Sequence, residues 1–238
     1  MIIASNFKTN YTRAKTKHFV HTVQAFIQRS QSTQEVRIFV PATALDCFNE
    51  VASLHVGAQN FYPVQNGSFT GEIGFEQLEE FDVKTVLIGH SERRHILGKT
   101  QEFLALKYAF AQAKHIEIVY CVGEPKEIRE KGIDAVMAYI WEQFEGIDIS
   151  YDKLVVAYEP VWAIGTGLTA SNRDIEEVLE RLAEKLSAPL LYGGSVKVDN
   201  LESILHVKHC EGVLVGTASW SEEAFCKMIE IADTVKKG

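Results

Sequence analysis

The sequence is short of positive charge. It contains 24 Lys and Arg residues against 32 Asp and Glu residues, which gives a formal net charge of -8 at pH 7. Binding of nucleic acid depends mainly on Lys and Arg contacts to phosphates, so we expect no nucleic-acid partner. An anionic substrate would need a local positive site set against this acidic background.

Long apolar runs are also missing. No segment reaches the length of a membrane-spanning helix, so we expect no membrane association. The first residues, MIIASNFKTNY, lack a basic leader, and their apolar part is shorter than that of a secretion signal. We therefore expect a protein of the cytoplasm.

Cysteine spacings that would suggest metal binding are absent. The chain has four cysteines, Cys47, Cys121, Cys210 and Cys226, with no CxxC or Cys/His ligand pattern. Their mostly apolar neighbours predict reduced thiols packed in the core. No His, Asp and Glu cluster has ligand spacing either, so we expect no metal.

Eight short apolar runs have the composition of strands. Most are not alternating, which is typical of strands buried on both faces in a parallel sheet. The runs are residues 1–5, 36–40, 55–59, 85–89, 116–121, 154–158, 189–192 and 212–215.

Helical periodicity fills most of the gaps between these runs. Ile175, Val178, Leu179 and Leu182 lie on one helical face behind the capping box SNRD, which starts at Ser171. The patterns after the second and third strands are the shortest. Eight strand–helix units without a linker predict a single-domain (β/α)8 TIM barrel over residues 1–238. The alternative is an open doubly wound sheet, but its glycine-rich first turn is missing from SNFKTN.

In such a barrel the reacting groups follow the C-terminal ends of the strands. Asn6 and Lys8 follow the first strand, His90 the fourth and Glu159 the sixth. Glycine-bearing loops, residues 193–195 and 216–217, follow the seventh and eighth. Each feature alone has a structural explanation, such as a solvated lysine, a hydrogen-bonded histidine or a turn. Barrel closure would bring all of them to one face, which favours an active site.

The chemistry of these groups is mutually consistent. Unhindered backbone N–H groups in the two glycine-bearing loops suit a phosphate, and Lys8 adds a fixed positive charge. Glu159 can act as a base on a carbon acid in a dry site. A short helix opening at HSERR would favour a neutral His90 ring that donates a hydrogen bond to an oxyanion.

The motifs NFK, IGHSERR, CVGE, AYEPVWAIGTG and LYGGSV resemble those of the triosephosphate isomerase family, in order along essentially the whole chain. The resemblance, to bacterial members, implies a cofactor-free aldose–ketose isomerase of glycolysis and gluconeogenesis that interconverts dihydroxyacetone phosphate and D-glyceraldehyde 3-phosphate through an enediolate. It implies Glu159 as the base, His90 as a neutral electrophile, and Lys8 and Asn6 as groups that bind the substrate oxygens.

The resemblance also implies further roles around the site. Glu92 matches a carboxylate that supports the catalytic histidine. The phosphate-binding amides would be those of Gly165, Ser195, Gly216 and Thr217. Residues 160–162 would form a stiff hinge and residues 163–167 the tip of a lid that excludes water.

Four positions depart from the family pattern. Thr217 stands where a second glycine is usual, and its side chain would approach the phosphate. Phe7 replaces a tryptophan, Lys99 stands where the family has an acid, and Leu168 replaces a lysine at the far end of the lid. The chain is also somewhat short for the family, and we place the missing residues in the weak crossovers.

The segment NGSFTGE, residues 66–72, reads by itself as an exposed glycine-rich loop. It resembles the loop that each subunit of the family inserts into its partner. The resemblance implies a homodimer in which Thr70 approaches the other active site and Glu72 pairs with the partner's Arg93.

Two other functions remain as alternatives at this stage. One is another sugar-phosphate isomerase or epimerase, which usually shows metal ligands or a different acid–base pair. The other is a catalytically silent phosphate-binding barrel that serves as a scaffold. Loss of Glu159, His90 or Lys8 would favour the silent barrel, but the sequence has all three.

Overall fold

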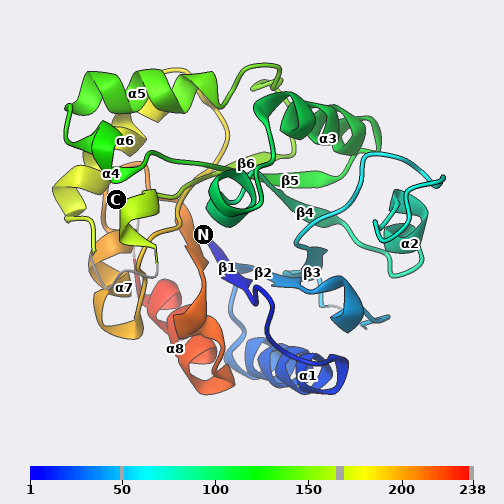
Figure 1. The fold of residues 1–238 in the computed structure, drawn as a ribbon. Helices are drawn as coiled ribbons and strands as arrows, with labels where there is room; N and C mark the ends of the chain where they lie inside the picture. Colours follow the sequence, from blue (N-terminus) through cyan, green and yellow to red (C-terminus); the bar gives the residue numbers. More distant parts are fainter. Residues whose placement is uncertain (49–50, 165–168, 236–238) are drawn as a thin grey trace.

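Eight parallel strands close into a barrel in the order of the chain, β1 to β8 (Figure 1). The structure, a computed structural model, describes residues 1–48, 51–164 and 169–235. The strand bounds agree with the predicted runs to within about two residues, which confirms the (β/α)8 prediction. They are β1 Ile2–Asn6, β2 Glu35–Val40, β3 Leu54–Ala58, β4 Thr85–Ile88, β5 Glu117–Val122, β6 Leu154–Tyr158, β7 Leu190–Tyr192 and β8 Gly212–Val215.

The first and last strands close the barrel. Ile2 of β1 lies in register with Gly212 of β8, and the pairing continues to Ser5 and Val215. A Cβ atom at position 212 would lie 1.9 Å from the carbonyl oxygen of Ile2, so only glycine permits this approach. The open-sheet alternative is therefore excluded.

A ring of helices covers the outside of the barrel (Figure 1). The α-helices are α1 Arg13–Ser30, α2 Phe75–Glu79, α3 Gln101–Ala113, α4 Lys126–Arg129, α5 Ile133–Glu142, α6 Asn172–Ala183, α7 Val198–Leu205 and α8 Glu222–Thr234. Four short turns, η1 Ala42–Ala44, η2 Glu92–Ile96, η3 Val161–Ala163 and η4 Thr217–Ser219, are π-helical in η2 and 3-10 in the others. The crossovers after β2 and β3 carry only η1 and the five-residue α2 among the described residues, as their weak periodicity predicted.

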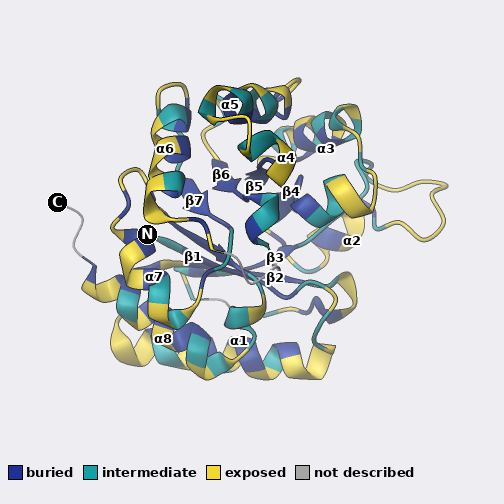
Figure 2. Cartoon of the chain, turned by 60° about the vertical axis from the view of Figure 1, so that its left-hand side comes forward, coloured by how far each residue is buried: buried dark blue, intermediate teal, exposed yellow. Residues whose placement is uncertain are grey.

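The helices turn their apolar faces to the barrel (Figure 2). In α6 the buried residues are the predicted ones, and Ser171 and Asp174 form the predicted capping box. The barrel interior is filled by side chains that include Phe39, Leu87 and Leu191. Since this interior is a packed core, a ligand has room only at the ends of the barrel.

The cysteine prediction is wrong at one position. Cys121, Cys210 and Cys226 are buried and all four thiols are free, but Cys47 is exposed. It follows η1 in a segment without regular structure, where its N–H donates to the Asp46 carboxylate, so no helix face packs it into the core.

The described part of the chain has neither a membrane-spanning helix nor a cluster of metal ligands. None of its helices is both long and apolar enough to cross a membrane. No group of three His, Cys, Asp or Glu side chains in residues 1–48, 51–164 and 169–235 is placed to hold a metal ion.

Candidate active site

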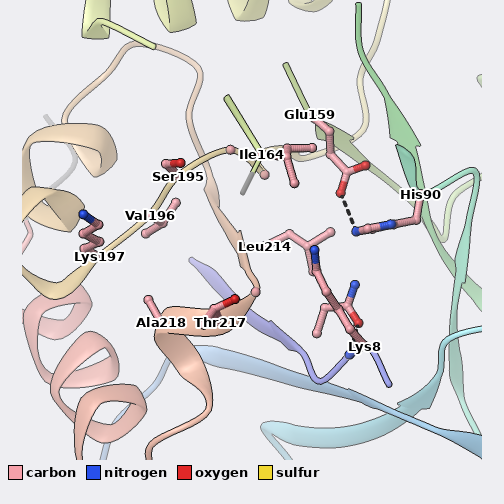
Figure 3. A pocket seen from close by; sticks show the side chains of 14 residues that line it. Lys8, His90, Glu159, Ile164, Ser195, Val196, Lys197, Leu214, Thr217 and Ala218 are labelled. Carbon is pink, nitrogen blue, oxygen red and sulfur yellow. Dashed lines mark hydrogen bonds and ion pairs between the residues drawn. The ribbon is translucent and has the colours of Figure 1, made fainter. Parts of the chain in front are cut away.

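A cavity of about 370 Å³ opens at the C-terminal ends of the strands. Lys8, His90 and Glu159 point into it from three different loops (Figure 3). The other residues that line it are Asn6, Ile164, Gly193, Gly194, Ser195, Val196, Lys197, Leu214, Gly216, Thr217 and Ala218. The nine residues that the sequence placed after five different strands therefore meet in one cavity.

Glu159 directly follows β6 and is 2% exposed. Its own N–H donates to the carbonyl of Val122, which fixes the backbone against β5. The carboxylate accepts a hydrogen bond from the N–H of Ser91 at 2.9 Å and lies 3.2 Å from Nε2 of His90. A carboxylate buried to this extent is shielded from bulk solvent, which suits a base in a dry site.

Glycine at position 193 leaves the space that the Glu159 side chain occupies. A Cβ atom there would lie 2.8 Å from Cγ of Glu159, which is well inside contact distance. The absence of a side chain at position 193 therefore helps to determine the position of the Glu159 carboxylate.

The contacts of His90 define its tautomer. Nδ1 accepts a hydrogen bond from the N–H of Glu92 at 3.3 Å, so Nδ1 carries no proton and Nε2 carries it. The neutral ring then presents Nε2–H to Glu159 and to the cavity. The short helix expected at HSERR is present as one turn, η2, that begins at Glu92.

Lys8 adopts a left-handed backbone conformation, with φ of 52°. Asn6 stabilises this turn, because its side-chain oxygen accepts the N–H of Lys8 at 3.0 Å. The ammonium group lies 2.6 Å from the carboxylate of Glu92. Glu92 itself lines a neighbouring cavity with Lys8 and His90 rather than the main one, so it contacts the cation from the side.

Ser195, Gly216 and Thr217 also line the cavity. The Ser195 hydroxyl donates to the carbonyl of Ala163 at 2.5 Å, so its side chain ties this loop to the segment that follows β6. Thr217 begins η4 and is not among the residues with positive φ, so its backbone does not require glycine. Gly165 and Leu168 lie outside the described residues.

One buried carboxylate near the site was given no role by the sequence. Glu124 is fully buried and follows β5, and its Oε1 accepts hydrogen bonds from Trp162 Nε1 at 2.9 Å and from the Tyr158 hydroxyl at 3.1 Å. Its carbonyl accepts the N–H of Val161 at 3.0 Å. Burial raises the pKa of Glu124. The signal was present in CVGE, a buried strand that ends in an acid as β6 does.

The departure at Lys99 has a visible consequence. Its ammonium group lies 5.3 Å from the centre of the Phe103 ring, a cation–π contact in place of an acid. The neighbouring Lys107 is fully buried, with its Nζ 2.6 Å from Oδ1 of Asn60. Burial, with the charges of Arg93 and Lys99, lowers the pKa of Lys107 to about 7.

Comparison with known proteins agrees with this geometry. The family model described as Triosephosphate isomerase matches residues 1–232. A triosephosphate isomerase of Sulfurimonas denitrificans is 52% identical over 237 residues, which cover 100% of this chain and 98% of the relative. Those of Nitratiruptor sp. and Wolinella succinogenes are 50% and 47% identical, and the matches cover 99% and 97% of this chain and 100% and 99% of the relatives. Beside these relatives the chain is not short. It belongs to the triosephosphate isomerase family.

Proposed function

We propose that this chain interconverts dihydroxyacetone phosphate and D-glyceraldehyde 3-phosphate, with Glu159 as the base and neutral His90 as the electrophile. The observation that carries these roles is the pairing of a buried Glu159 carboxylate with a His90 ring whose proton is on Nε2, in the same cavity as Lys8.

The reaction needs only proton transfers. Glu159 removes a proton from C1 of dihydroxyacetone phosphate, and the electron pair of that C–H bond forms the enediolate double bond while charge moves to the oxygen on C2. Lys8 and the Nε2–H of His90 stabilise this charge, and His90 moves a proton between the two oxygens. Glu159 then returns its proton to C2. Atoms and electrons balance within the substrate, so the reaction uses no cofactor.

Substrate binding would change the hydrogen bonds of the Glu159 carboxylate directly. Its two oxygens are engaged by the Ser91 N–H and by His90. A substrate oxygen that takes the Nε2–H of His90 frees one carboxylate oxygen to approach C1. Trp162, whose indole N–H donates to the Glu124 carboxylate, lies in the proposed hinge. Closure of the lid about this hinge would keep water from the enediolate.

The backbone N–H groups of Ser195, Gly216 and Thr217 are the proposed phosphate ligands, with Gly165 of the lid as a fourth. Ser195 and Thr217 lie across the cavity from His90 (Figure 3), and Gly216 lines the same cavity. Lys8 and Lys197, which both line the cavity, add positive charge against the acidic background of the chain.

The proposed assembly is a homodimer formed through residues 66–72. This loop lies between β3 and α2 and extends away from the barrel, with exposed residues at its tip (Figure 2). A second cavity, of about 460 Å³, lies beside the active site and is bordered by Ile96 and Leu97, which are 76% and 56% exposed. A partner's loop would fill this cavity, with its Thr70 near Lys8 and its Glu72 against Arg93, which lines the cavity.

Sedimentation tests the dimer. We expect a single species of twice the chain mass, and Glu72→Lys should shift it toward monomer with loss of activity. A wild-type monomer with full activity would refute the proposed assembly.

We place the enzyme in the cytoplasm, in glycolysis and gluconeogenesis.

A coupled assay with dihydroxyacetone phosphate tests the activity, and Lys8→Ala tests the site. One preorganised charge in a dry site contributes several kcal/mol to a barrier, so we expect Lys8→Ala to lose about 1,000-fold in kcat with its fold intact. A rate within tenfold of wild type would refute the role of Lys8. Absence of turnover by the folded wild-type dimer would instead favour a silent phosphate-binding barrel.

A further inference from the structure

Trp220 joins the loop that carries Lys8 to the loop proposed to bind phosphate. Its indole N–H donates to the carbonyl of Asn6 at 2.9 Å, although the two residues are 214 positions apart. Its own carbonyl accepts a hydrogen bond from the hydroxyl of Tyr11. One residue therefore binds both ends of the segment 6–11.

The segment between these two hydrogen bonds is conformationally strained. Lys8 and Tyr11 have φ of 52° and 72°, a backbone conformation that residues other than glycine rarely adopt. Such conformations persist only where surrounding contacts determine them, and they concentrate at functional sites. Lys8 lines the cavity from this left-handed conformation, so contacts that hold the segment also hold the cation.

Trp220 is in turn fixed to η4, the turn that begins with Thr217. Its N–H donates to the carbonyl of Thr217 at 3.2 Å. The buried Ser219 hydroxyl of η4 lies 2.6 Å from that of Ser5 on β1, a second link between η4 and the start of the chain. The Tyr11 ring stacks on Phe7, with centroids 4.5 Å apart. Movement of the phosphate-binding turn would therefore move the Lys8 segment with it.

We infer that Trp220 is a positioning residue for Lys8. Its indole N–H and its carbonyl, the latter through Tyr11, hold residues 6–11 in the conformation that presents Lys8 to the substrate and keep this segment in register with η4. The inference rests on the proposed role of Lys8. It adds a residue that touches no substrate atom and acts through another side chain.

The test is a set of paired variants assayed for kcat/KM at a temperature well below the melting temperature. Trp220→Phe removes the N–H donor and keeps an aromatic ring. Because a misplacement of about 1 Å can cost 100-fold, we expect a smaller displacement of Lys8 to lower kcat/KM about tenfold. Tyr11→Phe removes the other hydrogen bond and should lower it about threefold. If Trp220→Phe fails to fold, Tyr11→Phe replaces it in the comparisons described next.

The background variants separate positioning from general stability. In Lys8→Ala, Trp220→Phe should have less than a twofold further effect, because the group it positions is gone. In Glu159→Asp, where the altered group lies on another loop, Trp220→Phe should keep its tenfold effect. A purely structural role of Trp220 would lower activity by the same factor in all three backgrounds.

Two results would overturn the inference. One is a kcat/KM of Trp220→Phe within twofold of wild type, and the other is an undiminished loss in the Lys8→Ala background. Either would leave the proposed function standing if Lys8→Ala itself is nearly inactive. If Lys8→Ala were as active as wild type, the role of Lys8 and the inference would both fail.

Discussion

Replacement of Gly193 by alanine would place one methyl group against the proposed base. The added Cβ would lie 2.8 Å from Cγ of Glu159 and 3.4 Å from the carbonyl oxygen of Tyr158. Position 193 is not among the glycines with positive φ, so alanine fits the backbone and the effect is confined to this contact.

The size of the effect follows from that distance. Carbon atoms in contact prefer separations of about 3.5 Å or more, so the Glu159 side chain must move by at least about 0.7 Å. A misplacement of about 1 Å of a reacting group costs about 100-fold, so we expect kcat to fall between about 10-fold and 100-fold. Overpacking also destabilises the fold, by about 1–3 kcal/mol.

The assay is steady-state turnover of dihydroxyacetone phosphate by Gly193→Ala, with the melting temperature measured on the same preparation. The melting temperature controls for loss of folded protein. We expect KM to change little, because the loops proposed to bind phosphate keep their backbone. A kcat within threefold of wild type in a folded variant would refute the claim that the position of Glu159 limits the rate.

Two further predictions concern groups outside the proton path. Glu124→Gln should lower kcat about tenfold with little change in the melting temperature. The variant replaces the hydrogen bond from Trp162 to a carboxylate, at the proposed hinge, by a weaker one, and unchanged turnover would contradict the proposed hinge role. The pKa of Lys107 is about 7 in the folded chain against an ordinary value of 10.5, so the unfolded chain binds more protons between these pH values and stability rises with pH. Denaturant titrations measure the free energy of unfolding at each pH. Relative to Lys107→Met, this free energy should rise in wild type by up to about 1.4 kcal/mol per pH unit between pH 7 and 10. The same pH dependence in both proteins would contradict the burial of a titrating amine.

The barrel could be predicted because its signals are local. Each strand is a short run buried on both faces, such as residues 154–158, and each crossover helix has its own period and cap, as at Ser171. The candidate residues followed, because barrel topology sends the residues after every strand to one end. Glu159, His90 and Lys8 needed no further information to be placed together.

Contacts between loops could not be predicted in this way. The Ser91 N–H that holds Glu159, the Trp162–Glu124 hydrogen bond and the Trp220–Asn6 hydrogen bond join segments between 38 and 214 residues apart. They depend on side-chain directions that no spacing in the sequence encodes. The burial prediction for Cys47 was wrong for a related reason, since apolar neighbours predict burial only where a helix or strand presents them to the core.

Turnover by Glu159→Asp is the most direct test of the central claim that Glu159 is the base. Aspartate keeps the charge and the acid but withdraws the carboxylate by about one carbon–carbon bond, so we predict a loss of kcat of about 100-fold or more with a small change in KM. Measured in the coupled assay on folded protein, a kcat within tenfold of wild type would contradict the account.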